Sequence, residues 1–364
     1  MEKNEIFVTY GRDGYVLTKE LLARVNIEEL LPRKDAHIVL KPNLVVAQTP
    51  EGGATTHPGI VIATIEFLQE KGYSHIQIVE SAWVGDSTKR GFEVNGYYDI
   101  SKQYGVPLID VKDDVYEKKT FDGITMEISS VIVKSDFLIS LPVLKGHCQT
   151  LMTCSLKNMK GCLSDSSKRL FHSLGLHKPI AALNALRCAD LTIVDSLNGD
   201  LDFEEGGNPV QTDRMFIARD PVLCDTFGAN LLGFSPDDVA YIPLAAQYGV
   251  GSTDLQKAII TPLREPTVGV MAQPTGAVAH LARYVQPDRA CSACYGNLIH
   301  ALKRIEEEGK LSLVEKGICI GQGYRGKESC DHKGIGSCTC GFMQSQKGCP
   351  PSAKEMEDFL LNRF

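Results

Sequence analysis

Short apolar segments alternate with amphipathic segments through the first 240 residues of the chain. The segments 6–10, 37–44 and 75–81 are rich in Ile and Val and are bounded by turn residues, which predicts buried β-strands. Residues 57–72 instead repeat apolar side chains at helical spacing, which predicts a helix. Further strands are expected at 106–111, 136–144, 191–197 and 214–219, and helices near 90–104 and at 220–234. This alternation predicts an α/β fold with a mostly parallel sheet flanked by helices.

The pattern changes between residues 262 and 290, where prolines are frequent and helical periodicity is weak. The residues that follow are turn-rich and contain few apolar side chains. We therefore expect two domains, an α/β domain over residues 1–285 and a small cysteine-rich module over residues 286–364. A module with so little apolar material is expected to need a metal centre for stability.

Composition narrows the function classes. The chain has 364 residues, 43% of them hydrophobic, a net charge of −7 and a pI near 5.8, so neither a nucleic-acid partner nor an anionic membrane is expected. The first residues lack the apolar core of a signal peptide, and no apolar run approaches the roughly 18 residues of a membrane helix. We expect a cytoplasmic protein, in which cysteines serve as thiols or metal ligands rather than as a disulfide framework.

The cysteines are concentrated at the C-terminal end: seven of the twelve lie from residue 291 onward, and none precedes residue 148. Cys291 and Cys294, in CSAC, have the spacing that lets two sulfurs reach one metal or cluster from a single turn. Cys338 follows the glycines of GIGS. Cys349 precedes two prolines and the last predicted helix, where the helix dipole stabilises a thiolate. We expect these four cysteines to hold one metal centre.

The spacing leaves the identity of the metal open. Zinc ribbons usually carry two CxxC pairs and this chain has one, and the CxxCxxC run of ferredoxins is also absent. We favour a [4Fe-4S] cluster, with zinc as the main alternative and free or disulfide-bonded cysteines as a third. Cys319, Cys330 and Cys340 are then spare: they are free thiols, a redox pair, or ligands in place of one of the four.

Residues 141–178 form a basic stretch, with six Lys or Arg against one acid. Lys145 and His147 follow a predicted strand, and Lys157, Asn158 and Lys160 lie in SLKNMKG. In open α/β sheets, ligands bind beyond the carboxyl ends of strands. Lysine and amide donors at that place suit a phosphate, a carboxylate or another small anionic ligand.

Other polar residues also follow predicted strands. Lys41 and Asn43 lie in KPN, and His57 lies in GATTHP, so we expect them to converge with the basic stretch on one cleft. Asp195 ends the strand in TIVDS, where it is a candidate base or ion ligand, or a cap for the next turn.

Structural roles are the alternative for each of these residues: the lysines on a solvated helix face, and the histidines as surface or capping groups. His147, Cys148, Cys154 and Cys162 also offer metal ligands, but their spacing matches no known template. The sequence contains no Walker A motif and no GxSxG. GQGYRG at 321–326 neither follows a convincing strand nor opens a helix, so it does not predict dinucleotide binding.

Several motifs, in this order, resemble the family catalogued as "domain of unknown function 362". They are KPNLV (41–45), GATTHP (53–58), SDFLISLPVLKGH (135–147), SLKNMKG (155–161), TIVDS (192–196) and DPVLCDTFGANLLG (220–233). The resemblance covers roughly residues 5–250. Because members of that family often carry a ferredoxin-like iron–sulfur segment, the resemblance implies iron–sulfur rather than zinc. It implies no settled reaction, and the cysteine spacing departs from a simple ferredoxin repeat.

Together these observations predict a redox protein in which one [4Fe-4S] cluster serves an anionic ligand or a redox partner protein. The candidate catalytic residues are His147 as proton donor and Lys157 and Lys160 for charge stabilisation. The candidate ligand-binding residues are Lys41, Asn43, His57, Lys145, Asn158 and Asp195. Two alternatives remain: a non-redox binding protein or transferase with a structural [4Fe-4S] or zinc centre, and a redox-sensing regulator that uses the spare cysteines.

Overall fold

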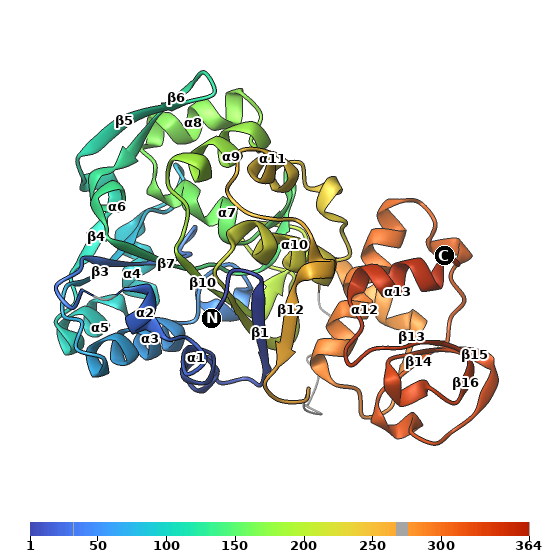
Figure 1. Ribbon diagram of the computed structural model, residues 1–364. Helices are drawn as coiled ribbons and strands as arrows, with labels where there is room; N and C mark the ends of the chain where they lie inside the picture. Colours follow the sequence, from blue (N-terminus) through green and yellow to red (C-terminus); the bar gives the residue numbers. More distant parts are fainter. Residues whose placement is uncertain (32, 267–275, 364) are drawn as a thin grey trace.

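The computed structural model describes residues 1–31, 33–266 and 276–363 and is built around an eight-stranded sheet (Figure 1). All neighbouring strands run parallel except where β11 meets β1 and β10, so the prediction of a mostly parallel sheet is confirmed. Across the sheet, the strands are β12 (Ile259–Pro262), β1 (Glu5–Tyr10), β11 (Pro209–Ala218), β10 (Leu191–Asp200), β7 (Phe137–Leu141), β2 (Ile38–Pro42), β3 (Ile76–Glu80) and β4 (Leu108–Asp110).

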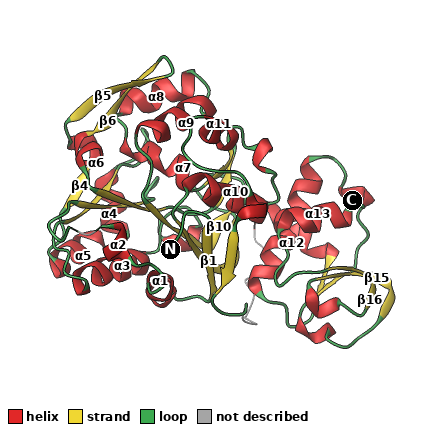
Figure 2. Ribbon diagram, viewed as in Figure 1, coloured by secondary structure: helices red, strands yellow, loops and turns green. Residues whose placement is uncertain are grey.

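Helices cover both faces of this sheet (Figure 2), because successive side chains of a buried strand point to opposite faces. In β2, Ile38 and Leu40 pack with one layer of helices, whereas Val39 packs with the other. The first layer contains α1 (Gly14–Leu22), α2 (Ile27–Leu30), α3 (Pro58–Glu70), α4 (Thr88–Val94) and α5 (Tyr97–Tyr104). The second contains α7 (Ser155–Asn158), α8 (Asp165–Ser173), α9 (His177–Leu186), α10 (Pro221–Leu231) and α11 (Tyr241–Gln247).

Two local expectations are corrected. The strand expected at 214–219 exists as part of β11, but it runs antiparallel because it returns directly from β10 through the loop 201–208. The helix expected near 90–104 is two helices, α4 and α5, because Gly96 lies between them at a φ of +70°, a conformation that helical residues do not adopt. A hairpin of β5 (Tyr116–Phe121) and β6 (Ile124–Ser129), followed by α6 (Ser130–Lys134), extends from the domain.

The C-terminal module contains a second, four-stranded sheet in which all strands are parallel. Its strands are β13 (Val285–Pro287), β14 (Ile318–Ile320), β15 (Ser329–Ile335) and β16 (Phe342–Gln346), with helices α12 (Ser292–Glu307) and α13 (Ala353–Leu360) packed on it. Contrary to the sequence-based expectation, the module has an apolar core. The strands β13, β14 and β15 each supply one or two apolar residues, and α12 and α13 supply most of the rest, so the core is not visible as a local apolar run.

The module forms a lobe on one side of the α/β domain, drawn orange to red in Figure 1. Helix α12 lies against β11, and Gly296 allows this close approach. A Cβ at position 296 would lie 2.8 Å from the backbone oxygen of Gln211. Arg214 of β11 is buried at the same junction and donates to Oδ1 of Asn297 in α12 at 3.2 Å. The position of α12, and of the cysteines at its start, is therefore tied to the central sheet.

Candidate functional site

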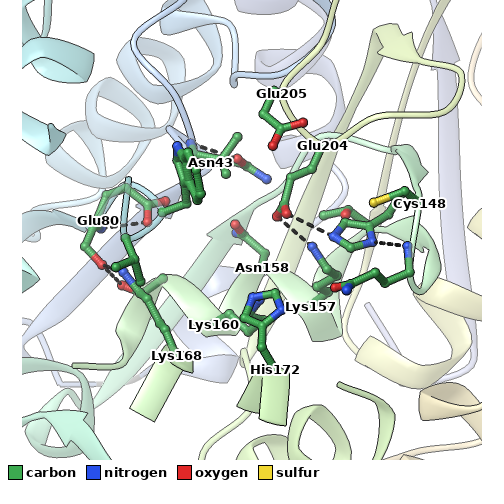
Figure 3. Close-up of a pocket in the computed structure, with 18 of the residues that line it drawn as sticks. Asn43, Glu80, Cys148, Lys157, Asn158, Lys160, Lys168, His172, Glu204 and Glu205 are labelled. Atoms are coloured by element: carbon green, nitrogen blue, oxygen red, sulfur yellow. Dashed lines mark hydrogen bonds and ion pairs between the residues drawn. The ribbon is translucent and has the colours of Figure 1, made fainter. Parts of the chain in front are cut away.

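A cavity of about 510 Å³ lies at the carboxyl ends of β2 and β3, where an open α/β sheet is expected to bind its ligand (Figure 3). Side chains from β2, β3, the loop 201–208 and the segment 147–172 line it. The small hairpin of β8 (Lys145–His147) and β9 (Leu151–Thr153) leads from β7 to this segment. Among the lining residues are Lys41, Asn43, His147, Lys157, Asn158 and Lys160.

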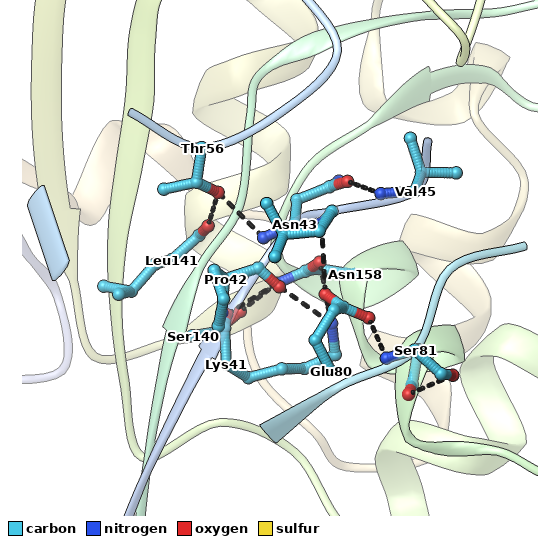
Figure 4. A network of polar contacts seen from close by, with 12 residues as sticks. Lys41, Pro42, Asn43, Val45, Thr56, Glu80, Ser81, Ser140, Leu141 and Asn158 are labelled. Carbon is cyan, nitrogen blue, oxygen red and sulfur yellow. Dashed lines mark hydrogen bonds and ion pairs between the residues drawn. The ribbon is translucent and has the colours of Figure 1, made fainter. Parts of the chain in front are cut away.

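The floor of the cavity is a buried ion pair between Lys41 and Glu80 (Figure 4). Their side chains are 1% and 3% exposed, and Nζ of Lys41 lies 2.7 Å from Oε2 of Glu80. Lys41 also donates to Oδ1 of Asn158 at 3.1 Å, and the amide of Ser81 donates to Oε1 of Glu80 at 2.7 Å. A Cβ at Gly161 would lie 2.1 Å from Oε1 of Glu80, so only glycine fits above the pair. The pair therefore fixes the ends of β2 and β3 relative to α7.

Glu204 crosses the cavity from the loop 201–208 and engages two predicted site residues (Figure 3). Its Oε1 accepts from Nζ of Lys157 at 2.6 Å, and its Oε2 lies 2.9 Å from Nε2 of His147. The amides of Gln149 and Thr150 donate to Nδ1 of His147, at 3.0 and 3.1 Å. The His147 proton is therefore on Nε2 and is donated to Glu204.

Electrostatics favour this protonation pattern. Burial, opposed by the hydrogen bond to Glu204, lowers the pKa of His147 to about 4, so the ring is neutral. Burial alone would raise the pKa of Glu204, but Lys157, the hydrogen bond from His147 and Lys160 together hold it well below its usual range. Glu204 is therefore a carboxylate at neutral pH, and His147 positions it. This arrangement gives His147 a structural task in addition to its predicted role as a proton donor.

Lys160 and Lys168 bring further positive charge to the cavity. Burial, followed by repulsion from Lys157, lowers the pKa of Lys160 to about 7. Its ammonium lies 3.4 Å from Nε2 of His172, and within the described residues it forms no ion pair with a carboxylate. Burial also lowers the pKa of Lys168 to about 8; this side chain donates to the hydroxyl of Ser81 and lies 3.7 Å from Asp165.

The remaining predicted residues lie elsewhere. His57 and Asp195 line a second cavity of about 340 Å³, together with Arg12 and Asp213. Asp195 accepts from the amides of His57 and Leu197, at 2.9 and 3.1 Å, which anchors the start of α3 to β10. Lys145 is buried between the chain segments and donates to the backbone oxygens of Ala54 and Glu204. The residues that we expected in one cleft are therefore separated: His57 and Asp195 line a second cavity, and Lys145 lines neither.

Four important residues of the larger cavity were not identified in the sequence: Glu80, Trp83, Lys168 and Glu204. Glu80 had a local signal, because it is the acidic end of a predicted strand. Lys168 lies within the basic stretch. Glu204 and Trp83 lie in loops, and no periodic pattern marks which loop residues turn toward a site.

The four predicted cysteine ligands come together at the edge of the C-terminal module. Cys291 precedes α12, Cys294 lies in its first turn, Cys338 lies in the turn between β15 and β16, and Cys349 lies between β16 and α13. Burial raises the pKa of Cys294, and the thiols of Cys291, Cys349 and Cys338 add to this rise through their charge. Such mutual effects require that all four sulfurs be near neighbours. Tyr10, at the end of β1, interacts with Cys349 and Cys294, which places the group beside the central sheet.

The four sulfurs are neighbours without being tightly packed. In the described part of the chain, the one set of three or more metal-ligating atoms within 4.8 Å of one another is Cys154, Cys224 and Asp225. Four sulfurs on a single zinc ion would lie about 3.8 Å apart, because each Zn–S bond is about 2.3 Å long. Among the described residues, no three of the tail cysteines therefore lie within 4.8 Å of one another, as the ligands of one zinc ion would.

The other cysteines do not join this group. The thiols that affect the pKa of Cys294 do not include Cys319, Cys330 or Cys340. Cys319 is buried on β14, where it donates to Oε1 of Gln286 at 3.7 Å. Cys154 is paired with Cys224 in the interior, so the alternative metal site of His147, Cys148, Cys154 and Cys162 is wrong as a single set. Asp225 accepts from the amides of Ser155 and Leu156, and it therefore serves to hold α7 in place.

The fold and the two sites define an α/β protein with a ligand-sized cavity at the carboxyl edge of its sheet and a separate cysteine-rich module. The chain belongs to the family described as "Domain of unknown function (DUF362)", whose model matches residues 38–230. Every helix in the described residues is too short or too polar to cross a lipid bilayer.

Two further similarities were found. The chain is 26% identical over 243 residues to the thylakoid-associated protein sll1697 of Synechocystis sp. (strain ATCC 27184 / PCC 6803 / Kazusa), covering 63% of this chain and 72% of that protein. It also resembles the lactate racemase apoprotein from Thermoanaerobacterium thermosaccharolyticum, with a TM-score of 0.45 and 14% identity. That match covers 62% of this chain and 57% of the racemase chain. A likeness this low supports no inference about cofactor or substrate.

Proposed function

We propose that the protein binds one [4Fe-4S] cluster through Cys291, Cys294, Cys338 and Cys349 and uses it for electron transfer. The observation that carries the proposal is the convergence of these cysteines from three separate segments of the chain onto one place. Sulfur ligands select iron–sulfur clusters and zinc over the metals that prefer oxygen. The group therefore has the donor set of a metal centre.

The spacing of the sulfurs favours a cluster over zinc. A cubane cluster holds its cysteine ligands at its four corners, farther apart than the ligands of a single ion. Gly336, two residues before Cys338, lies beside Cys294: a Cβ at this position would be 3.4 Å from Sγ of Cys294. When bound, the cluster would supply one-electron redox chemistry.

A redox role is favoured over a purely structural one by two features of the module. Its helices and strands already share an apolar core, so the metal centre is not needed as a substitute for one. Cys349 is exposed and Cys338 is partly exposed. A cluster held there would have an edge at the surface, where a partner protein can exchange electrons with it.

The test is the iron and sulfide content of protein prepared without oxygen, together with its visible and electron paramagnetic resonance spectra. About four irons and four sulfides per chain are expected, with reversible bleaching on reduction. Cys338→Ser should lose most of the iron. Cys340→Ser, two residues away but outside the group, is the matched control and should keep it.

Each other outcome contradicts a defined part of the proposal. One zinc per chain without sulfide would show that the centre is a zinc site and not an iron–sulfur cluster. A cluster that cannot be reduced would show that the centre is structural and does not transfer electrons. Equal iron loss in the Cys338 and Cys340 variants would show that the ligand set is wrong.

A further inference from the structure

We propose that the cavity at the carboxyl ends of β2 and β3 binds a small organic oxyanion that carries a flat apolar group. This inference is independent of the metal centre, because it rests on residues of the α/β domain alone. It specifies the chemistry of the ligand: a carboxylate or phosphate head, held by Lys160 and its neighbours, and an apolar body against Trp83.

The positive charge of the cavity is only partly neutralised. Lys41 is paired with Glu80 at 2.7 Å, and Lys157 is paired with Glu204 at 2.6 Å. Lys160 remains without such a pair: among the described residues its ammonium contacts Nε2 of His172 at 3.4 Å and forms no ion pair with a carboxylate. Arg169 adds a further positive charge to the lining. Lys160 is only partly buried, and its ammonium lies where the cavity meets the solvent. An ammonium that has lost part of its hydration without gaining an anionic partner would be stabilised by an anion entering from solvent.

Glu204 is a carboxylate of the protein that already binds cationic and hydrogen-bonding groups in this cavity. Its carboxylate already lies inside the cavity and binds the Lys157 ammonium and the neutral His147 ring from one side. Lys160 contributes to the electrostatic environment of this same carboxylate. A ligand oxyanion on the side of Lys160 away from Glu204 would be stabilised by Lys160, whereas Lys157 is already engaged by Glu204.

Part of the cavity lining is apolar. Trp83, Val45 and Val84 line it, and the Trp83 side chain is 47% exposed. The amide of Trp83 donates to the backbone oxygen of Val45 at 3.0 Å, which holds the loop against β2. A Cβ at Gly85 would lie 2.4 Å from the indole ring, so the ring rests directly on the backbone. A fixed, half-exposed indole face suits a planar apolar group.

The size of the cavity agrees with such a ligand. A volume of about 510 Å³ falls in the range of sites for small molecules, which is roughly 300–1,000 Å³. A lining that combines cationic groups with an exposed indole suits a ligand that has one charged and one flat apolar part.

Trp83 also makes the proposal testable, since it is the only tryptophan of the chain and its fluorescence reports on this cavity. The probes are phenyl phosphate and benzoate, with inorganic phosphate lacking the apolar part and benzyl alcohol lacking the charge. We expect phenyl phosphate or benzoate to change the fluorescence and to give a calorimetric binding signal at lower concentration than either partial probe. Whichever of these two probes binds more tightly shows whether the cavity prefers a phosphate or a carboxylate head group.

Lys160→Met should weaken binding of the better probe about tenfold or more, the loss expected for a charge-assisted hydrogen bond. Lys118→Met, at a side chain that is 75% exposed on the β5–β6 hairpin, is the control and should bind as the unmodified protein does. Thermal unfolding verifies that both variants are folded. The proposal is overturned if neither aromatic probe binds at millimolar concentration, if benzyl alcohol binds equally well, or if a folded Lys160→Met protein retains full affinity.

Discussion

Replacing Glu80 by glutamine removes one charge from the buried ion pair beneath the cavity and leaves the ammonium of Lys41 inside the protein. Both side chains are almost fully buried, and the pair has a 2.7 Å contact. Breaking a buried pair by removing one partner costs about 3–5 kcal/mol, because the remaining charge is uncompensated. Glutamine can still accept one hydrogen bond from Lys41, so we expect a loss near the lower end, about 3 kcal/mol. That is a large share of the roughly 5–15 kcal/mol by which a domain is stable.

The free energy of unfolding can be measured in urea, with Trp83 fluorescence as the signal for the α/β domain. Glu70→Gln serves as the control: Glu70 pairs with Lys19 at 2.8 Å, but its side chain is 65% exposed. An exposed pair contributes at most about 1 kcal/mol. The double variant Lys41→Met with Glu80→Gln removes both charges and should recover part of the loss. If Glu80→Gln costs no more than Glu70→Gln, the pair does not stabilise the fold and this reasoning is refuted.

Three further predictions concern buried polar groups. Arg214→Met should speed the loss of iron to a chelator, because Asn297 loses the donor that ties α12 to β11; an unchanged rate would contradict this. Burial raises the pKa of Asp225 to about 7, so between about pH 4 and pH 7 the folded protein binds a proton that the unfolded chain has lost. The free energy of unfolding that Asp225 contributes is therefore complete below about pH 4 and is lost as the pH rises to about 7. The stability of wild type relative to Asp225→Asn should therefore fall over that range in urea titrations, and a constant difference would argue against the shift. Between about pH 5, where benzoate is still ionised, and pH 7, benzoate affinity in calorimetry should be roughly constant; above pH 7 it should fall, by as much in total as in Lys160→Met, as Lys160 loses its proton. A flat profile would exclude Lys160 as the anchor. The charged or titratable groups around Lys160 are Lys157, Lys168, Glu204 and His172.

The sequence predicted the parts of the structure that depend on local pattern. Residues 57–72 and 220–234 contain the helices α3 and α10, and the predicted strands correspond to β1, β2, β3, β4, β7 and β10. Turn residues and side-chain periodicity determine such elements within a few residues of chain. CSAC was recognisable for the same reason, because its two sulfurs need only one turn to converge.

Charge pairing in the cavity was decided by tertiary structure. Lys41 and Glu80 are 39 residues apart in sequence, and Lys157 and Glu204 are 47 apart. Nothing near Lys157 in the chain shows that a loop glutamate will neutralise it while Lys160 keeps its charge. That difference makes Lys160 the candidate anchor for a ligand, and it exists only after the loop 201–208 has folded over the cavity.

The sequence by itself therefore determined the α/β character of the protein and the positions of most strands, and it singled out the cysteines that are candidate metal ligands. Only the tertiary structure separated His57 and Asp195 from the lysine-lined cavity, reversed the direction of β11 and built an apolar core for the C-terminal module. The physical reason is the range of the interactions. Backbone periodicity acts over a few residues, whereas ion pairs, cavities and packed cores join segments that are distant in the chain.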